Sequence, residues 1–266
     1  MEGSDRTPVI VSAARTPVGR FLGGLAPLRA PELGAVAIRA AIARAGIDAA
    51  AIEDVIMGNV IQGGVGQAPA RQAAIAAGIP GTVPAVTVNM VCGSGLKAVM
   101  LAAQAIRAGD LSAVVAGGQE SMSNAPFYAY GLRNGVKFGD QTLVDGLIKD
   151  GLWCSFCDVH MGGHAEYTAK KAGITRQQQD EFALASHRKA IAAIDAGRFS
   201  EEIAPVEIPG KKGPTIIDTD ESPRRDTSLE QLAKLRPAFP KITSSIADGS
   251  IPARAIVARI ATAPSS

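Results

Sequence analysis

The sequence has few cysteines, no long run of like charges and no apolar run long enough to span a bilayer. Its three cysteines, at positions 92, 154 and 157, are too few and too clustered for the disulfide framework of a secreted domain, which favours a reducing compartment. The 27 basic residues almost balance the 25 acidic ones, so nucleic-acid binding is not indicated. Residues 1–8 resemble neither a secretory signal nor an Arg-rich presequence. These absences predict a cytoplasmic protein that binds neither nucleic acid nor a membrane.

The composition is that of a folded chain. With 266 residues, 47% of them hydrophobic, the chain can bury a substantial core and divide into two domains. Apolar and β-branched runs predict strands at 9–14, 55–60, 87–91 and 112–116, and they alternate with helix patterns at 31–46, 69–77 and 96–107. This alternation predicts an α/β fold with a parallel sheet covered by helices on both faces. We expect the Ala-rich helix 96–107 to be largely buried.

Cys92 lies in the stretch TVNMVCGSGLKA, between the predicted strand 87–91 and the predicted helix 96–107. Unpaired N–H groups and the positive end of the helix dipole favour a thiolate there, and the thiolate is the form that attacks carbonyl carbons. The local pattern is also typical of a small buried hydrophobe beside a strand. We expect Cys92 to be the most reactive of the three thiols, because Cys154 and Cys157 lie in a turn with no nearby helix start.

The regular alternation ends at about residue 121. The sequence then predicts a helix over 164–172, and Thr175 with Gln178 forms the capping box of a long helix that ends near Ala196. Residues 203–208 and 215–218 predict two strands joined by the turn PGKKGP. This change of pattern indicates a second domain of α+β type.

The stretch WCSFCDVHMGGH raises the question of a metal site. Its Cys154, Cys157, His160 and His164 have the spacing C-x2-C-x2-H-x3-H, and thiolates with imidazoles are typical zinc ligands. Common zinc modules separate the two pairs by a dozen residues or so, whereas here the pairs nearly touch. The two histidines share a helix face only if the helix begins before Gly162, which consecutive glycines oppose. We therefore favour no metal here, and a zinc-stabilised module remains an alternative.

Two strings, VNMVCGSGLKA and GGQESMS at residues 117–123, resemble the thiolase family of acyl-CoA acyltransferases. The resemblance extends from about residue 9 to residue 239. It implies an α/β, thiolase-like layered β-α-β-α-β domain with an inserted α+β loop domain. On this basis residues 1–120 form the N-terminal domain, with 240–266 as its altered end, and residues 121–239 form the loop domain that binds coenzyme A.

The resemblance also implies roles for particular residues. Cys92 matches the cysteine that carries the acyl group as a thioester, with its own backbone N–H as one oxyanion donor. Leu152, His160 and Met161 match positions in the string GL…HMG that line the coenzyme A pocket.

Basic and hydroxyl side chains match further coenzyme A contacts. Arg224, in ESPRRDTSLEQ, matches an arginine near the nucleotide end of coenzyme A, although the adjacent Arg225 could take its place. Ser244, in SSIADGS, matches another coenzyme A contact. The resemblance implies no metal and no cofactor, with coenzyme A thioesters as substrates.

The implied activity is the condensation of two acetyl-CoA molecules to acetoacetyl-CoA, or the thiolytic cleavage of 3-ketoacyl-CoA. The resemblance also implies a role in fatty acid metabolism and a homo-oligomer, either a dimer or a tetramer. The family's GHP, NxxGG and late CxG motifs, which supply the general base and the second cysteine, have no counterpart in this sequence. We therefore expect this chain alone to be a poor catalyst. A truncated, noncatalytic acyl-CoA-binding or interaction subunit is the alternative.

Overall fold

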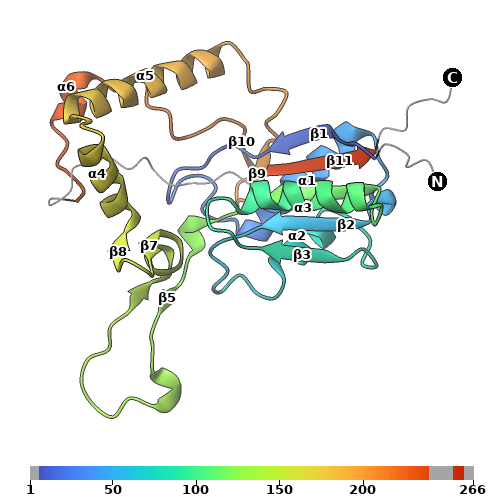
Figure 1. The fold of residues 1–266 in the computed structure, drawn as a ribbon, viewed down its shortest axis with the longest axis horizontal. Coiled ribbons are helices and arrows are strands. Elements are labelled where there is room, and N and C mark those ends of the chain that lie inside the picture. The colour runs from blue at the N-terminus through green and yellow to red at the C-terminus, as the bar shows by residue number, and fades with distance from the viewer. Residues whose placement is uncertain (1–5, 240–253, 261–266) are drawn as a thin grey trace. The chain divides into compact units, whose positions relative to one another are not determined.

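The computed structural model describes residues 6–239 and the backbone of 254–260 (Figure 1). Ser244 lies outside the described residues. The contacts divide the described chain into two compact units: unit 1 holds residues 6–125, 202–219 and 254–260, and unit 2 holds 126–201 and 220–239. The sequence analysis assigned residues 202–219 to the loop domain, and the structure groups them with unit 1. Each unit is described by itself below.

Unit 1 has the alternating elements that the sequence predicts and one further strand at 254–260. They are β1 (Pro8–Arg15), α1 (Ala30–Ala45), β2 (Asp54–Gly58), α2 (Pro69–Ala76), β3 (Ala85–Val88), α3 (Ser94–Ala108), β4 (Ala113–Gly118), the hairpin β9 (Val206–Ile208) and β10 (Thr215–Ile217), and β11 (Arg254–Ile260). Short 3-10 turns occupy Ala49–Ala51 and Met122–Asn124. Helix α1 has Pro31 in its first turn and is capped by Gly46, whose φ of 63° is a left-handed conformation that glycine adopts without strain.

The five-stranded sheet of unit 1 has the order β1-β11-β4-β2-β3. Strand β2 pairs in parallel with both β3 and β4, as predicted. Strand β11 is antiparallel to β1 and to β4, so the predicted parallel sheet includes one antiparallel strand. The sequence analysis assigned no strand to residues 254–260, although RAIVARI is an apolar run, because its place between two distant strands depends on long-range pairing.

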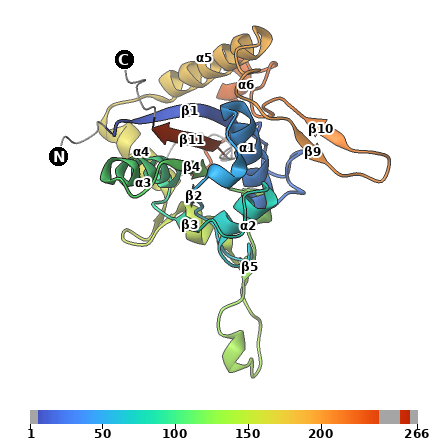
Figure 2. The same cartoon turned by 90° about the vertical axis from the view of Figure 1, so that its right-hand side faces the viewer.

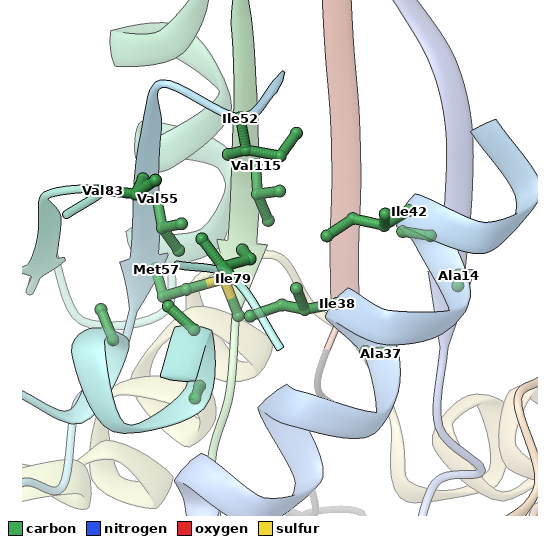
Figure 3. Packing of buried hydrophobic residues seen from close by; sticks show 14 of the residues in the cluster. Ala14, Ala37, Ile38, Ile42, Ile52, Val55, Met57, Ile79, Val83 and Val115 are labelled. Atoms are coloured by element: carbon green, nitrogen blue, oxygen red, sulfur yellow. The ribbon is translucent and has the colours of Figure 1, made fainter. Parts of the chain in front are cut away.

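Helices cover both faces of this sheet, which confirms the prediction (Figure 2). Alternate side chains of the strands point to opposite faces, because the side-chain period of a strand is two residues. On one face, shown in Figure 3, the strands pack against α1 and α2 through Val55, Met57 and Val115. On the other face they pack against α3 through Ile56, Val114 and Ala116.

Helix α3 is buried along one side only, and the prediction that it is largely buried is wrong. Ala98, Ala102 and Ile106 recur at a spacing of four and face the sheet. The opposite side is open, with Leu96 68% exposed and Met100 46% exposed. An apolar sequence does not reveal whether a second layer covers the helix.

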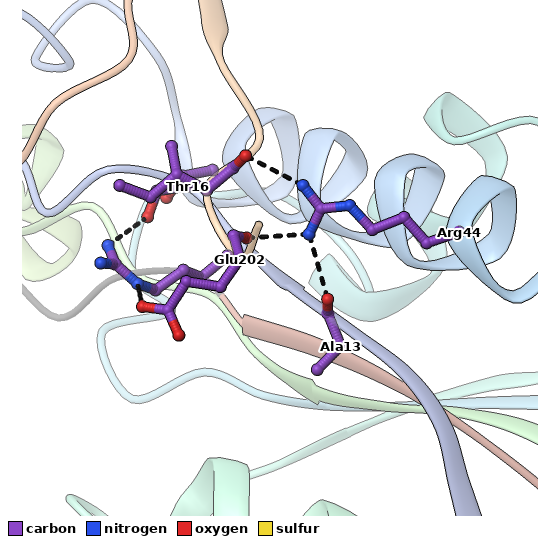
Figure 4. A network of polar contacts seen from close by, with 6 residues as sticks. Ala13, Thr16, Arg44 and Glu202 are labelled. Atoms are coloured by element: carbon purple, nitrogen blue, oxygen red, sulfur yellow. Dashed lines mark hydrogen bonds and ion pairs between the residues drawn. The ribbon is translucent and has the colours of Figure 1, made fainter. Parts of the chain in front are cut away.

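The hairpin of β9 and β10 belongs to unit 1 because the segment before it is hydrogen-bonded to the end of β1. The Arg15 N–H donates to the Glu202 carbonyl at 2.9 Å, and the Ala204 N–H donates to the Arg15 carbonyl at 2.7 Å. Arg44, in the last turn of α1, donates to the carbonyls of Ala13 and Glu202 at 3.1 and 3.0 Å (Figure 4). A cation at a helix C-terminus is favoured by the helix dipole.

Unit 2 has short strands and longer helices. Its elements are β5 (Phe127–Tyr128), β6 (Val144–Asp145), a π-helical turn (Leu147–Leu152), β7 (Trp153–Cys154), β8 (Val159–His160), α4 (Met161–Lys171), α5 (Arg176–Asp195) and α6 (Leu229–Ala233). The capping box of Thr175 and Gln178 at the start of α5 is confirmed. In the part of the chain that the structure describes, no helix is both long and apolar enough to cross a bilayer.

Helix α4 begins at Met161, ahead of the two glycines that the sequence analysis took as opposed to a helix. The His160 Nδ1 atom caps it by accepting the N–H of Gly162 at 3.0 Å. A Cβ at Gly162 would collide with the ring of Phe239, which stacks at 4.8 Å from the His160 ring. Glycine is therefore present because Phe239 packs there, and this packing outweighs its low helix propensity.

Candidate functional site

The Cys92 turn, residues 89–93, connects the end of β3 to the start of α3. Val91 has a φ of 47°, which is a strained conformation for a β-branched residue. Such strain persists only where the surrounding structure fixes it, and it is concentrated at functional sites. The Cys92 side chain is exposed. The predicted position of Cys92, between a strand end and a helix start, is therefore the observed one.

Hydrogen bonds to Ser94 and Asn89 fix this turn. The buried Ser94 hydroxyl accepts the Met90 N–H at 2.8 Å and donates to the Val91 carbonyl at 2.6 Å. The Asn89 carboxamide oxygen accepts the Val91 N–H at 2.9 Å. Both polar groups of Val91 are thereby paired, and this pairing opposes the release of the strained φ.

Glycines let the first turn of α3 lie directly on the sheet. A Cβ at Gly58, the last residue of β2, would stand 2.6 Å from backbone and side-chain carbons of Ser94 and 2.7 Å from the Gly95 nitrogen. Backbone atoms cannot move aside as a flexible side chain can, so only glycine fits. A Cβ at Gly118, at the end of β4, would stand 3.4 Å from the Gly95 Cα atom. This close approach positions the Cys92 turn over the sheet edge.

A cavity of about 380 Å³ opens beside Cys92, within unit 1. It lies at the carboxyl ends of the parallel strands β2 and β4 and against the first turns of α3. Ligands bind at this edge in open α/β sheets, as expected for Cys92 from the sequence. Its walls combine apolar side chains with a few polar ones, a composition typical of small-molecule sites. Lining residues include Ile10, Asn59, Val60, Val91, Cys92, Ser94, Leu96, Val99, Gln119 and Glu120.

Glu120 lines this cavity and is held there by hydrogen bonds. Its carboxylate accepts the N–H groups of Val60 and Ile61 at 2.8 and 3.2 Å and the Asn59 side-chain amide at 2.7 Å. Burial raises the pKa of Glu120, and the same hydrogen bonds, which favour the charged form, oppose that rise. Glu120 thus ties the segment after β2 to the end of β4.

Sequence reasoning missed the polar wall formed by Asn59, Gln119 and Glu120. Glu120 lies in the quoted string GGQESMS, and a carboxylate that directly follows a buried strand was the available signal. Among the described residues, the Asn59 Oδ1 atom and both polar atoms of the Gln119 carboxamide are buried without a hydrogen-bond partner. Unpaired buried polar atoms are costly in a folded protein and often mark a site where a ligand or water binds.

Four of the residues expected to contact coenzyme A, namely Leu152, His160, Met161 and Arg224, belong to unit 2, whereas Cys92 belongs to unit 1. Trp153 pairs with His160 in the β7–β8 hairpin, which brings the neighbouring Leu152 and Met161 to the same open end of the hairpin. Leu152 and His160 are half-buried, and Met161 is exposed. Three of the predicted positions are thus adjacent in space.

Arg224 and Arg225 differ in their contacts. The Arg225 guanidinium makes two hydrogen bonds to the Asp195 carboxylate, at 2.6 and 3.0 Å. The backbone N–H of Arg224 donates to His187 Nδ1 at 3.1 Å. In the described part of the chain, no partner binds the Arg224 guanidinium. Of the two arginines that the sequence left open, Arg224 is the one whose guanidinium is available for a phosphate.

The premise that Cys154 and Cys157 lie far from a helix start is wrong, because α4 begins at Met161, directly after β8. The pKa of the Cys154 thiol is lowered to about 7, chiefly by the Cys157 peptide N–H and then by His164. The pKa of Cys157 is raised because its thiol donates to the Cys154 sulfur and meets the negative charge there. Position at a helix start therefore does not by itself single out Cys92.

Comparison with known proteins gives one consistent result. The profile described as "Thiolase, N-terminal domain" matches residues 8–254. An acetyl-CoA acetyltransferase of Pseudomonas aeruginosa is 56% identical over 246 residues, which cover 92% of this chain and 61% of that protein. An acetyl-CoA acetyltransferase of Cupriavidus necator is 55% identical over 245 residues, or 91% of this chain and 62% of that protein.

A third relative, a probable acetyl-CoA acetyltransferase of Escherichia coli, is 50% identical over 249 residues, which cover 91% of this chain and 63% of that protein. The chain thus spans about three fifths of the length of the curated relatives that it matches.

Proposed function

The chain belongs to the thiolase family, and from this premise we propose that it is a thiolase-type acyltransferase in which Cys92 carries the acyl group. The observation that carries the proposal is the hydrogen-bonded turn that places Cys92 beside a cavity, at the carboxyl ends of parallel strands. The names of the relatives support acetyl-CoA as the substrate.

In the first step, the Cys92 thiolate attacks the carbonyl carbon of an acyl-CoA thioester. The new C–S bond to Cys92 gives a tetrahedral intermediate. When this intermediate collapses, the bond from the carbonyl carbon to the coenzyme A sulfur breaks, and the departing thiolate takes up a proton. The tetrahedral intermediate places negative charge on the carbonyl oxygen, where the Cys92 N–H is the proposed donor. The acyl group then passes to a coenzyme A thiol, or to the carbanion of a second acetyl-CoA.

We assign coenzyme A binding to Leu152, His160, Met161, Arg224 and Ser244. The unpaired guanidinium of Arg224 suits a phosphate of the nucleotide. Coenzyme A thioesters are substrates, and the proposal includes no cofactor. We further propose that the protein is a cytoplasmic homotetramer that acts in fatty acid metabolism and binds neither nucleic acid nor a membrane. Acetoacetyl-CoA is the product of condensation and the substrate of thiolysis.

Acyl transfer to Cys92 is tested by a single-turnover experiment, which needs no complete catalytic cycle. The chain is mixed with acetyl-CoA carrying a labelled acetyl group, quenched in acid and digested. The mass of each cysteine peptide is then measured by mass spectrometry. We expect the label on the peptide that contains Cys92. Cys92→Ser removes the label, and the double variant Cys154→Ser/Cys157→Ser, which keeps Cys92 as its only thiol, retains it.

The same experiment separates the enzyme from the noncatalytic alternative. Protection by coenzyme A against thermal unfolding, without label on any cysteine, would indicate an acyl-CoA-binding subunit. Label on Cys154 or Cys157 in place of Cys92 would contradict the assignment of the nucleophile.

A further inference from the structure

The Cys154–Cys157 hairpin has a geometry that the proposed acyl transfer does not use. Cys154 ends β7, and the chain reverses through four residues into β8. Asp158, directly after Cys157, has a φ of 51°, and its carboxylate accepts the Trp153 indole N–H at 2.9 Å. The tight reversal turns both cysteine side chains toward the same side of the hairpin, where His164 joins them.

The backbone of this reversal is arranged to stabilise sulfur as a thiolate. The peptide N–H groups of Cys157 and Phe156 donate hydrogen bonds to the Cys154 sulfur. Donation by two successive N–H groups to the first sulfur of a C-x-x-C loop lowers the cost of placing negative charge there. A thiolate, not a thiol, is the form that binds a metal ion.

His164 supplies an imidazole to the same place. It lies in the first turn of α4, which is possible because the helix begins ahead of Gly162. Its side chain interacts with the Cys154 sulfur, and its buried Nε2 atom has no other hydrogen-bond partner among the described residues. One ligand atom each from Cys154, Cys157 and His164 lies within 4.8 Å of the other two. His160 is outside this cluster, because its Nδ1 atom caps α4.

We propose that Cys154, Cys157 and His164 bind one Zn²⁺ ion, which fixes the β7–β8 hairpin to the first turn of α4. Two thiolates and an imidazole are a typical zinc set, and the fourth tetrahedral position is left for water or an added ligand. Bond lengths of about 2.0 to 2.3 Å place tetrahedral ligand atoms roughly 3.5 to 3.8 Å apart, so each pair of ligand atoms must approach by about 1.3 Å or less. The compact spacing that weighed against zinc in the sequence is therefore no obstacle in three dimensions.

Cobalt(II) is the spectroscopic probe, because it adopts the zinc geometry and absorbs visibly. The full chain is reduced, treated with a chelator, freed of it and titrated with cobalt. We expect about one equivalent to give the near-ultraviolet band of a cobalt–thiolate bond and the intense visible bands of a tetrahedral site, and added zinc to abolish both. Cys154→Ser, Cys157→Ser and His164→Ala each lose this spectrum.

Two matched controls keep the spectrum. Cys92→Ser removes the remaining thiol of the chain, and His187→Asn removes an imidazole outside the cluster while keeping an acceptor for the Arg224 N–H. Circular dichroism establishes that each cluster variant retains its helices. An unchanged cobalt spectrum in a folded Cys154→Ser or Cys157→Ser variant would overturn the proposal.

A second measurement uses the unmutated protein, so it does not depend on the folding of a variant. Zinc should protect Cys154 and Cys157 against iodoacetamide and leave Cys92 reactive, as read from the masses of the cysteine peptides. Equal labelling of the hairpin cysteines with and without zinc would contradict the site. A Cys154–Cys157 disulfide, with no cobalt bands after its reduction, would show instead that the pair is a redox couple.

Discussion

Two cysteine-bearing turns precede helices in this chain, and they differ in what surrounds the sulfur. The Cys92 turn follows a strand of the five-stranded sheet, contains a strained Val91 and borders a cavity of about 380 Å³. The Cys154–Cys157 hairpin is formed by two strands of two residues each and borders an imidazole. One turn places a single thiol beside empty space, and the other places two thiols beside a nitrogen ligand.

This difference shows that a helix start near a thiol does not define its chemistry. Both turns have one, and the Cys92 turn also has beside it a cavity with a polar wall, which a reacting thioester needs. At the hairpin the neighbours of the sulfur are themselves ligands for a cation, which suits metal binding. Substitutions that alter one turn at a time separate the two chemistries.

Replacing Gly58 by alanine should have the largest effect. Its Cβ would stand 2.6 to 2.7 Å from the backbone of Ser94 and Gly95, so the first turn of α3 must move away from β2. We expect the free energy of unfolding to fall by about 3 kcal/mol, the upper part of the usual range for overpacking. Urea unfolding measures this loss. Labelling of Cys92 by acetyl-CoA should fall with it, because the turn moves with the helix.

Gly95→Ala is the matched control. A Cβ at Gly95 meets its nearest neighbours, backbone atoms of Gly117 and Gly118, at 3.8 Å, an ordinary contact distance. Because alanine also favours a helix over glycine by roughly 0.5 to 1 kcal/mol, this variant should be at least as stable as the parent. Equal stabilities for the two variants would refute the close approach of α3 to β2.

Ser94→Ala tests the hydrogen bonds that fix the Cys92 turn. The substitution leaves the Met90 N–H without its acceptor and removes the donor to the Val91 carbonyl. We expect a loss of about 1 to 3 kcal/mol in the free energy of unfolding, the usual cost of an unpaired buried group. Ser200→Ala, which removes one exposed hydroxyl bonded to Gly197, should change stability by less than about 0.5 kcal/mol. Similar losses in both variants would deny Ser94 a special role.

The elements of unit 1 were predictable from the sequence because their signals are local. Alternating apolar runs, the proline that opens α1 and the glycine that ends it each reflect the preference of a few adjacent residues. Strand β11 was missed because its place between β1 and β4 depends on residues far away in the chain. The start of α4 was misplaced for the same reason, since Phe239 explains Gly162 and lies 77 positions later.

The site was predictable only where one residue type carries the chemistry. Cys92 stands out in its string, and its position between β3 and α3 follows from local patterns. Glu120 and Asn59 did not stand out, because their role appears only when the ends of β2 and β4 lie side by side. The Cys154, Cys157 and His164 cluster was identified as a spacing and set aside, because its pairs are closer than in common zinc modules and because the sequence did not reveal where α4 begins.

The two hairpin cysteines should react at different rates in reduced, metal-free protein. Hydrogen bonds from the Cys157 peptide N–H, the His164 side chain and the Phe156 peptide N–H lower the pKa of Cys154 to about 7, whereas the pKa of Cys157 is raised. Near pH 7, we expect iodoacetamide to label Cys154 roughly tenfold faster or more, because the thiolate is the reactive form. The Cys154 rate should fall as the pH drops below 7. Equal rates for the two peptides would mean that the N–H groups do not stabilise the thiolate.

Val91→Gly should have the smallest effect on stability, and the effect should be an increase. A φ of 47° costs a β-branched residue of order 1 to 3 kcal/mol, and glycine adopts this conformation without strain. The gain is partly offset by roughly 0.5 to 1 kcal/mol of additional backbone entropy in the unfolded chain, and the exposed Val91 side chain gives up little burial. We therefore expect an increase of about 1 kcal/mol in the free energy of unfolding, measured in urea.

The same substitution at Val86 is the control, because Val86 is similarly exposed and lies in the edge strand β3 with ordinary backbone geometry. Val86→Gly should lose stability, since glycine weakens a strand by roughly 0.5 to 1 kcal/mol. Opposite signs at the two positions would locate stored strain in the Cys92 turn. If Val91→Gly is also more slowly acylated at Cys92, the strain holds the thiol in place for reaction. A loss of stability at both positions would mean that the turn is relaxed and that Ser94 and Asn89 alone determine where Cys92 points.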